Sequence, residues 1–160
     1  MWQRIIETKI SVCSFNELSD NQQQLVENAK AQVANAYAPY SGFHVGAAVE
    51  LANGAIFAGN NQENSAYPSG LCAERVAMFY ANAQFPQTTV KRLAIAAYTN
   101  GDFLKSPVTP CGACRQVLLE SETRFDSDIE VILYGVDEVY VLKNVKQLLP
   151  LCFEKSSLKQ

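Results

Sequence analysis

Three cysteines and one glutamate stand in two short motifs whose spacing suits metal chemistry. Cys72 and Glu74 form a C-x-E unit, and Cys111 and Cys114 form a C-x-x-C unit later in the chain. Thiolates are ligands that Zn²⁺ prefers, and two cysteines three positions apart on a helical turn face the same way. If Cys72 joins this pair, the fourth position of a tetrahedral ion is left to water, which is typical of catalytic zinc sites. We therefore expect a zinc ion held by Cys72, Cys111 and Cys114, with Glu74 beside it as a base.

Both motifs are predicted to lie at helix N-termini. Cys72 opens an apolar helical run, and Pro110 precedes Cys111, where proline suits a helix start. Unpaired N–H groups and the positive end of a helix dipole lower a thiol pKa and so favour the thiolate. Three thiolates on a divalent cation leave a net charge of about −1. Arg75 would offset that charge by donating hydrogen bonds to sulfur.

Periodicity and turn signals predict the elements that position these motifs. Ser19 and Gln22 have the spacing of a capping box and begin a helix expected over residues 19–37. Asn53-Gly54 is a strong hairpin signal between two extended runs. In all, we expect helices at 19–37, from 72 and at 111–122, a short one at 145–149, and strands at 43–51, 55–60, 93–98, 129–134 and 139–142.

Right-handed crossovers between parallel strands would bring the starts of the second and third helices to the same edge of the sheet. The predicted fold is therefore α/β: a three-layer α/β/α sandwich around a mixed five-stranded sheet. The 160 residues have no composition break and no linker, so a single domain over residues 1–160 is expected.

Composition narrows the class of protein and partner. Arg4, Glu7 and Lys9 interrupt the first fourteen residues, which lack the apolar run of a signal peptide, so we expect a cytoplasmic protein without a membrane span. Five cysteines, an odd number, favour metal or redox chemistry over a disulfide framework. The net charge is −3 and the basic residues are scattered, which argues against a nucleic-acid partner and favours a small molecule.

The only histidine and the two cysteines outside the motifs are given structural interpretations. His44, the only histidine, stands in a predicted strand and forms no H-x-E unit, so it is read as an ordinary strand residue. Cys152 also begins a C-x-E sequence, but no amphipathic helix follows it. Cys13 and Cys152 are expected to be small buried apolar residues.

Taken together, residues 72–75 (CAER) and 110–116 (PCGACRQ) resemble the zinc-dependent cytidine deaminases, specifically the small homotetrameric type with three cysteine ligands. Residues 40–48 (YSGFHVGAA) resemble a strand of that family, and residues 59–67 (GNNQENSAY) resemble its nucleoside-binding segment. Leu148-Leu149-Pro150 with Phe153 is similar to its C-terminal element. The resemblance covers roughly residues 20–155. The first fifteen residues form an N-terminal extension beyond it, and the loop at 99–109 is longer than usual.

The resemblance implies a cytidine deaminase-like fold and a zinc-dependent hydrolase with one Zn²⁺ per subunit. Its reaction would convert cytidine and 2'-deoxycytidine to uridine and 2'-deoxyuridine plus ammonia, in pyrimidine salvage. Glu74 would take a proton from water, deliver a proton to ring N3 and help the amine leave. No nucleic acid or membrane partner is implied.

The resemblance also assigns residues to the nucleoside. Asn61 and Glu63 would hydrogen-bond the ribose hydroxyls, and Phe43 would stack on the pyrimidine. Tyr67 and Phe153 would help build a pocket that neighbouring subunits complete, so a homotetramer with shared active sites is implied. The other residues expected at the substrate are Ala66 and Ala73. Two residues are expected to act on the metal ligands without binding the metal. One is Arg75, and the other is Gln116, which is either an exposed helix position or a donor to a thiolate.

Two alternatives stay open at this point. A related deaminase could act on a cytosine-containing antibiotic such as blasticidin S or on another modified nucleoside, although Phe43, Asn61 and Glu63 favour a free nucleoside. A protein of a different class, a structural zinc module or a C-x-x-C redox protein, would also use the cysteines. Glu74 argues against the second alternative, because such a module does not need it.

Overall fold

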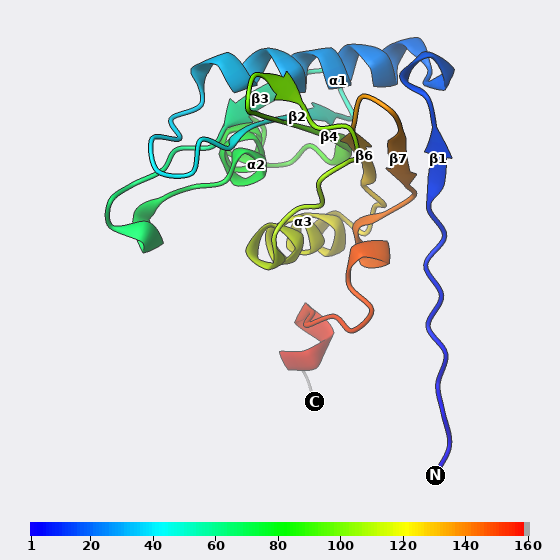
Figure 1. Cartoon of the computed structure of the whole chain (residues 1–160). Helices are drawn as coiled ribbons and strands as arrows, with labels where there is room; N and C mark the ends of the chain where they lie inside the picture. Colours follow the sequence, from blue (N-terminus) through cyan, green and yellow to red (C-terminus); the bar gives the residue numbers. More distant parts are fainter. Residues whose placement is uncertain (159–160) are drawn as a thin grey trace.

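The computed structural model describes residues 1–158 and has a mixed β-sheet with helices on both faces (Figure 1). Within these residues the sheet has seven strands, in the order β1-β7-β6-β4-β2-β3, with β5 paired to β4. The helix α1 covers one face, and α2 and α3 cover the other, so the predicted three layers are confirmed. The helices are α1 (Asp20–Gln32), α2 (Ala73–Gln84) and α3 (Gly112–Phe125); the strands are β1 (Ser11–Cys13), β2 (His44–Leu51), β3 (Ile56–Asn60), β4 (Val90–Thr99), β5 (Asp102–Phe103), β6 (Glu130–Tyr134) and β7 (Val139–Leu142).

The expected number of five strands is wrong, because two short strands join the sheet. β1 pairs antiparallel with β7, so part of the expected N-terminal extension is an edge strand. β5 lies in the loop expected at 99–109 and pairs with the end of β4. Before β1, Thr8 and Lys9 still hydrogen-bond to Gln147, and the residues that precede them run away from the body as an extended arm (Figure 1). The two extra strands are only three and two residues long, too short for an alternating pattern to reveal them.

The helix α1 begins as predicted and ends earlier than predicted. The backbone N–H of Ser19 donates to Oε1 of Gln22 at 3.0 Å, which forms the capping box. The helix ends at Gln32 instead of continuing to Tyr37. Tyr37 leaves the helix because its backbone N–H and C=O bond to the chain at Asn61 and Glu63. This pairing joins the end of the first helix to the segment expected to bind the nucleoside.

Two glycines let the helices approach the sheet closely. A Cβ atom at Gly59 in β3 would lie 2.8 Å from the backbone nitrogen of Ala77 in α2. A Cβ atom at Gly46 in β2 would run into the carbonyl oxygen of Ala29 in α1. Both contacts would require the backbone to shift, so glycine is needed at both positions. The position of α2, which follows Cys72 and carries Glu74, therefore depends on Gly59.

The topology brings the starts of α2 and α3 together. α3 connects β4 to β6, and these two strands pair in parallel. α2 connects β3 to β4, and both of these strands run antiparallel to β2, which lies between them. The two connections therefore cover the same face of the sheet, on which α2 and α3 pack over one buried cluster. No helix in residues 1–158 is long and apolar enough to cross a bilayer.

Candidate active site

The three cysteines of the two motifs form a compact cluster. Their Sγ atoms all lie within 4.8 Å of one another, with 3.8 Å between Cys72 and Cys111 and 3.4 Å between Cys111 and Cys114. Cys72 is the N-cap residue of α2 and Cys111 that of α3, while Cys114 is fully buried in the first turn of α3. Zn–S bonds of about 2.3 Å place tetrahedral sulfur ligands about 3.8 Å apart. The cluster therefore fits a zinc ion in both donor chemistry and spacing.

The residues around the cluster favour a thiolate at Cys72. A hydrogen bond from the Cys114 thiol, together with the Arg75 guanidinium, lowers the pKa of Cys72 to about 5. The Nη2 atom of Arg75 donates to Sγ of Cys72 at 3.6 Å. Hydrogen bonding to Cys72 and burial raise the pKa of Cys114, so the two sulfurs favour one thiolate and one thiol in the absence of a cation. A divalent cation would remove the remaining proton.

Glu74 lies in the first turn of α2, next to this cluster in the chain. Its exposed fraction is only 5%, which is rare for a carboxylate, and burial raises its pKa above the ordinary value. Glu74 lines a cavity of about 350 Å³ together with Cys72 and Cys111. A buried carboxyl group in the wall of such a cavity is placed to exchange protons with a bound molecule.

The same cavity gathers most of the residues expected at the substrate. Its lining includes Phe43, Asn61, Glu63 and Ala73. Sequence reasoning did not find the other lining residues, Ser41, Val45, Ile95, Val108 and Thr109. Val108 and Thr109 directly precede the P-C-x-x-C motif, and this position in the sequence could have indicated that they lie near the metal cluster. A second cavity of about 510 Å³ shares Ser41, Asn61, Glu63 and Cys72 and continues past Tyr40, Gln62, Asn64, Tyr67, Gly70, Leu71 and Arg75.

Hydrogen bonds fix Asn61 and Glu63, two polar residues in the wall of the cavity that Glu74 lines. The amide of Asn61 accepts from the backbone N–H of Val45 at 2.8 Å and donates to the carbonyl of Phe43 at 2.9 Å. One further N–H and one lone pair of this amide stay available to a ligand. Glu63 accepts from the Ser41 hydroxyl and from the backbone N–H of Tyr40, which hold the pKa of Glu63 below its ordinary value. The ionised carboxylate of Glu63 can accept hydrogen bonds from hydroxyl groups of a ligand.

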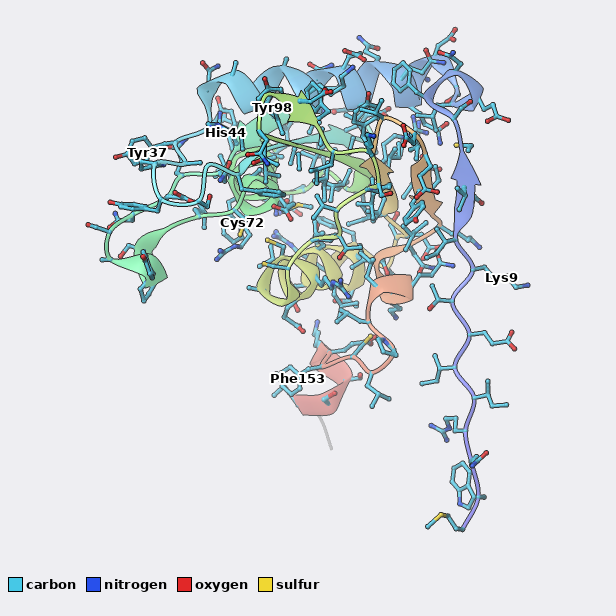
Figure 2. The ribbon with its side chains drawn as sticks, in the orientation of Figure 1. Lys9, Tyr37, His44, Cys72, Tyr98 and Phe153 are labelled. Carbon is cyan, nitrogen blue, oxygen red and sulfur yellow. The ribbon has the colours of Figure 1, made fainter. Side chains whose placement is uncertain are left out.

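Four expected site residues do not line the cavity of Glu74 in the single chain. Tyr67 lines the second cavity but is 77% exposed, and Ala66 is exposed in the same loop and lines neither cavity. Phe153 is 61% exposed and lies well apart from Cys72 (Figure 2). The amide of Gln116 donates to the backbone carbonyl of Phe153 at 2.9 Å, so it supports the C-terminal segment and not a thiolate.

The three residues given structural interpretations, His44, Cys13 and Cys152, are not members of the metal cluster. His44, at the start of β2, is not a member of it, and its ring packs edge-on against Tyr98 with centroids 6.5 Å apart. Cys152 is half-buried and packs against the hydrophobic core. Cys13 is also half-buried, so both cysteines contact the core without being fully enclosed.

Comparison with known proteins agrees with this geometry. The family model for the cytidine and deoxycytidylate deaminase zinc-binding region matches residues 19–125. A cytidine deaminase of Sporosarcina psychrophila is 40% identical over 136 residues, which cover 85% of this chain and 93% of that protein. A cytidine deaminase of Halalkalibacterium halodurans is 38% identical over 133 residues, which cover 83% of this chain and 94% of that protein.

Solved structures show the same relationship in three dimensions. The crystal structure of cytidine deaminase from Burkholderia pseudomallei has a TM-score of 0.69 and 40% identity, covering 81% of this chain and 97% of that chain. That from Mycobacterium tuberculosis has a TM-score of 0.65 and 32% identity, covering 84% and 98%. The cysteine cluster, the buried glutamate and these matches lead to one conclusion: the chain is an enzyme of the cytidine and deoxycytidylate deaminase family.

Proposed function

We propose that this protein catalyses the hydrolytic deamination of cytidine and 2'-deoxycytidine to uridine and 2'-deoxyuridine, with release of ammonia, as a step of pyrimidine salvage in the cytoplasm. The observation that carries this proposal is the position of Glu74. Its buried carboxyl group shares one cavity with Cys72, Cys111 and the expected nucleoside-binding residues. A structural zinc module or a redox protein has no use for such a carboxyl group.

The metal of this site is proposed to be Zn²⁺, one ion per subunit, held by Cys72, Cys111 and Cys114. Its contribution when bound is Lewis acidity, which lets water act as a nucleophile near neutral pH. Arg75 supports the metal site because its guanidinium donates to the Cys72 sulfur. The buried position of Cys114 keeps one ligand away from competing solvent.

Proton transfer in the reaction is assigned to Glu74. Its carboxylate accepts a proton as the oxygen of water bonds to C4 of the cytosine ring, and it delivers that proton to ring N3. The second proton of the water then passes through Glu74 to the exocyclic amine. The C4–N bond breaks, ammonia leaves, and the C4 carbonyl of uridine remains. General acid and base catalysis of this kind contributes roughly 10² to 10⁴ in rate.

The nucleoside would lie against the wall of the cavity that contains Phe43, Asn61 and Glu63. Phe43 contributes an aromatic side chain to the cavity, and Ala73 contributes a small side chain beside Glu74. The Glu63 carboxylate and the remaining N–H and lone pair of the Asn61 amide would bind the ribose hydroxyls. The lining of the cavity contains no lysine or arginine. A nucleoside without phosphate groups therefore suits this wall better than a nucleotide.

We also infer that several copies of the chain complete the site, as a homotetramer. Tyr67 is 77% and Phe153 61% exposed, and Ala66 lies in the same exposed loop. Large apolar side chains at such exposure suit an interface. Phe153 lines neither of the two cavities described above and lies apart from Cys72 in the single chain (Figure 2). Sedimentation tests this inference, and a fully active monomer would overturn it.

The proposed function is tested by an ultraviolet time course of zinc-loaded protein with cytidine, with the products identified as uridine and ammonia. Deoxycytidine, cytidine monophosphate and free cytosine define the substrate class in parallel. We expect conversion of both nucleosides and slow or no conversion of the monophosphate. Absence of conversion by the zinc-loaded oligomer would refute the proposed substrate and direct the search to modified cytosine nucleosides.

A further inference from the structure

The loop that leads into Cys111 has almost no hydrogen bonds of its own. In the described part of the chain, residues 106–110 take part in no backbone–backbone hydrogen bond, and Pro107 and Pro110 have no N–H group to donate. Cys111 is the exposed member of the cysteine cluster, whereas Cys114 is buried within α3. On its C-terminal side Cys111 is fixed by α3, because the backbone N–H of Arg115 donates to its carbonyl at 2.9 Å. On its N-terminal side the position of Cys111 depends on whatever holds this loop.

Arg115 holds it from the first turn of α3. Its Nε atom donates to the carbonyl of Pro110 at 2.8 Å, and its Nη2 atom donates to Oγ1 of Thr109 at 2.9 Å. These are the hydrogen bonds found for residues 106–110 within the described chain. The third guanidinium nitrogen, Nη1, donates to the carbonyl of Leu148 at 2.7 Å. One side chain therefore joins the Cys111 loop to α3 and to the C-terminal part of the chain.

We propose that Arg115 is a positioning residue that sets the place of Cys111 in the metal site. This inference rests on the metal site of the proposed function and adds a residue that does not touch the metal. The planar guanidinium suits the role because it directs three donors to three separate acceptors at fixed angles. A lysine at this position has one nitrogen and reaches fewer of these acceptors at once.

The neighbouring residue provides a matched comparison. Gln116 also extends from the first turn of α3 and is half-buried like Arg115, but it donates to the carbonyl of Phe153 and not to the Cys111 loop. Loss of Gln116 should therefore disturb the C-terminal segment and leave the metal ligands in place. Loss of Arg115 should release the loop that carries Cys111.

The test measures metal binding directly, in the full chain. Zinc affinity is determined by competition with a chromogenic chelator, and Co²⁺ loading gives the visible and near-ultraviolet bands of a tetrahedral thiolate site. The variants are Arg115→Ala, Arg115→Lys, Thr109→Val and Gln116→Ala, each first compared with the wild type by circular dichroism. Mutation of a residue that orients a metal ligand without contacting the metal commonly costs about 10- to 100-fold in metal affinity.

We expect Arg115→Ala and Arg115→Lys to lose at least about tenfold in zinc affinity and to weaken the Co²⁺ bands. Thr109→Val should lose less, and Gln116→Ala should match the wild type. If Arg115→Ala does not fold, Arg115→Lys and Thr109→Val provide the test. Wild-type affinity in Arg115→Lys, or an equal loss in Gln116→Ala, would overturn the proposal. Because no deamination is measured, failure of the proposed substrate would not be mistaken for failure of this inference.

Discussion

The cysteine cluster with Glu74, called the metal side here, and the proposed nucleoside side of the site are built in different ways. On the metal side, Cys72, Glu74, Cys111 and Cys114 come from two helix N-termini that pack over one buried core. On the nucleoside side, several expected contacts lie in exposed segments, among them the loop of Tyr67 and the C-terminal segment of Phe153. One chain thus brings the cysteines and Glu74 together by itself, whereas Tyr67 and Phe153 are exposed and would be covered only in the proposed homotetramer. Variants on the two sides should therefore have different kinetic effects.

The largest effect is expected at Glu74. Glu74→Gln keeps the size of the side chain and removes the proton acceptor, so turnover of cytidine should fall at least about a hundredfold while zinc stays bound. Steady-state kinetics and metal analysis of the same preparation check this prediction. Glu120→Gln, on an exposed position of α3, is the control and should have wild-type turnover. Near-normal turnover in Glu74→Gln would remove Glu74 from the mechanism.

A smaller loss is expected at Arg75, also on the metal side. Its guanidinium donates to Sγ of Cys72 at 3.6 Å and offsets the charge of the thiolates. Arg75→Gln should lower zinc affinity by about tenfold or more, and added zinc should restore part of the activity. Competition with a chelator measures the affinity. If zinc binds Arg75→Gln as tightly as the wild type, charge compensation at Cys72 does not support the metal.

On the nucleoside side, Phe153→Ala should act through the Michaelis constant. If a neighbouring copy receives this ring, loss of an aromatic contact worth about 0.5 to 1.5 kcal/mol raises KM by about two- to tenfold with little change in kcat. Leu158→Ala, at another exposed apolar position near the C-terminus, is the matched control. A large fall in kcat with unchanged KM would place Phe153 with the metal side and break the distinction between the two sides.

Local signals in the sequence account for most of the fold and for the metal side. The capping box at Ser19, the hairpin at Asn53-Gly54 and the proline before Cys111 each depend on neighbouring residues, and each predicted element is present. β1 was missed because its partner β7 is more than a hundred residues away in the chain. Nothing in a three-residue segment indicates such a distant partner.

The same limit explains what was missed in the site. The spacing of the cysteines predicted their meeting, since both motifs start helices that share one face of the sheet. The role of Arg115 depends on Leu148, which reaches α3 only in the folded chain. Gln116 was expected either to be exposed or to bind a thiolate, and its acceptor is the backbone of Phe153 instead. Backbone acceptors have no residue signature, so sequence patterns do not reveal such contacts.

The smallest expected effect is a pH dependence of stability at Glu63. The Ser41 hydroxyl and the backbone N–H of Tyr40 donate to its carboxylate, so its pKa in the folded protein lies below the ordinary value of about 4.3. Unfolding restores the ordinary pKa. The stabilising contribution is therefore complete at pH values above that ordinary pKa and is lost as the pH falls through the lower pKa of the folded state.

Glu63→Gln should accordingly lower Tm at pH 7 by a small amount, on the order of a degree or two, and the gap to the wild type should close in acid. Thermal unfolding measured at intervals from pH 7 to pH 3 checks this prediction, with Glu120→Gln as the control. A gap that stays constant or widens toward pH 3 would mean that the Ser41 and Tyr40 hydrogen bonds do not favour the Glu63 carboxylate. The nucleoside wall would then lack the preformed acceptor that distinguishes it from the exposed loop of Tyr67, and ribose binding would depend on Asn61 alone.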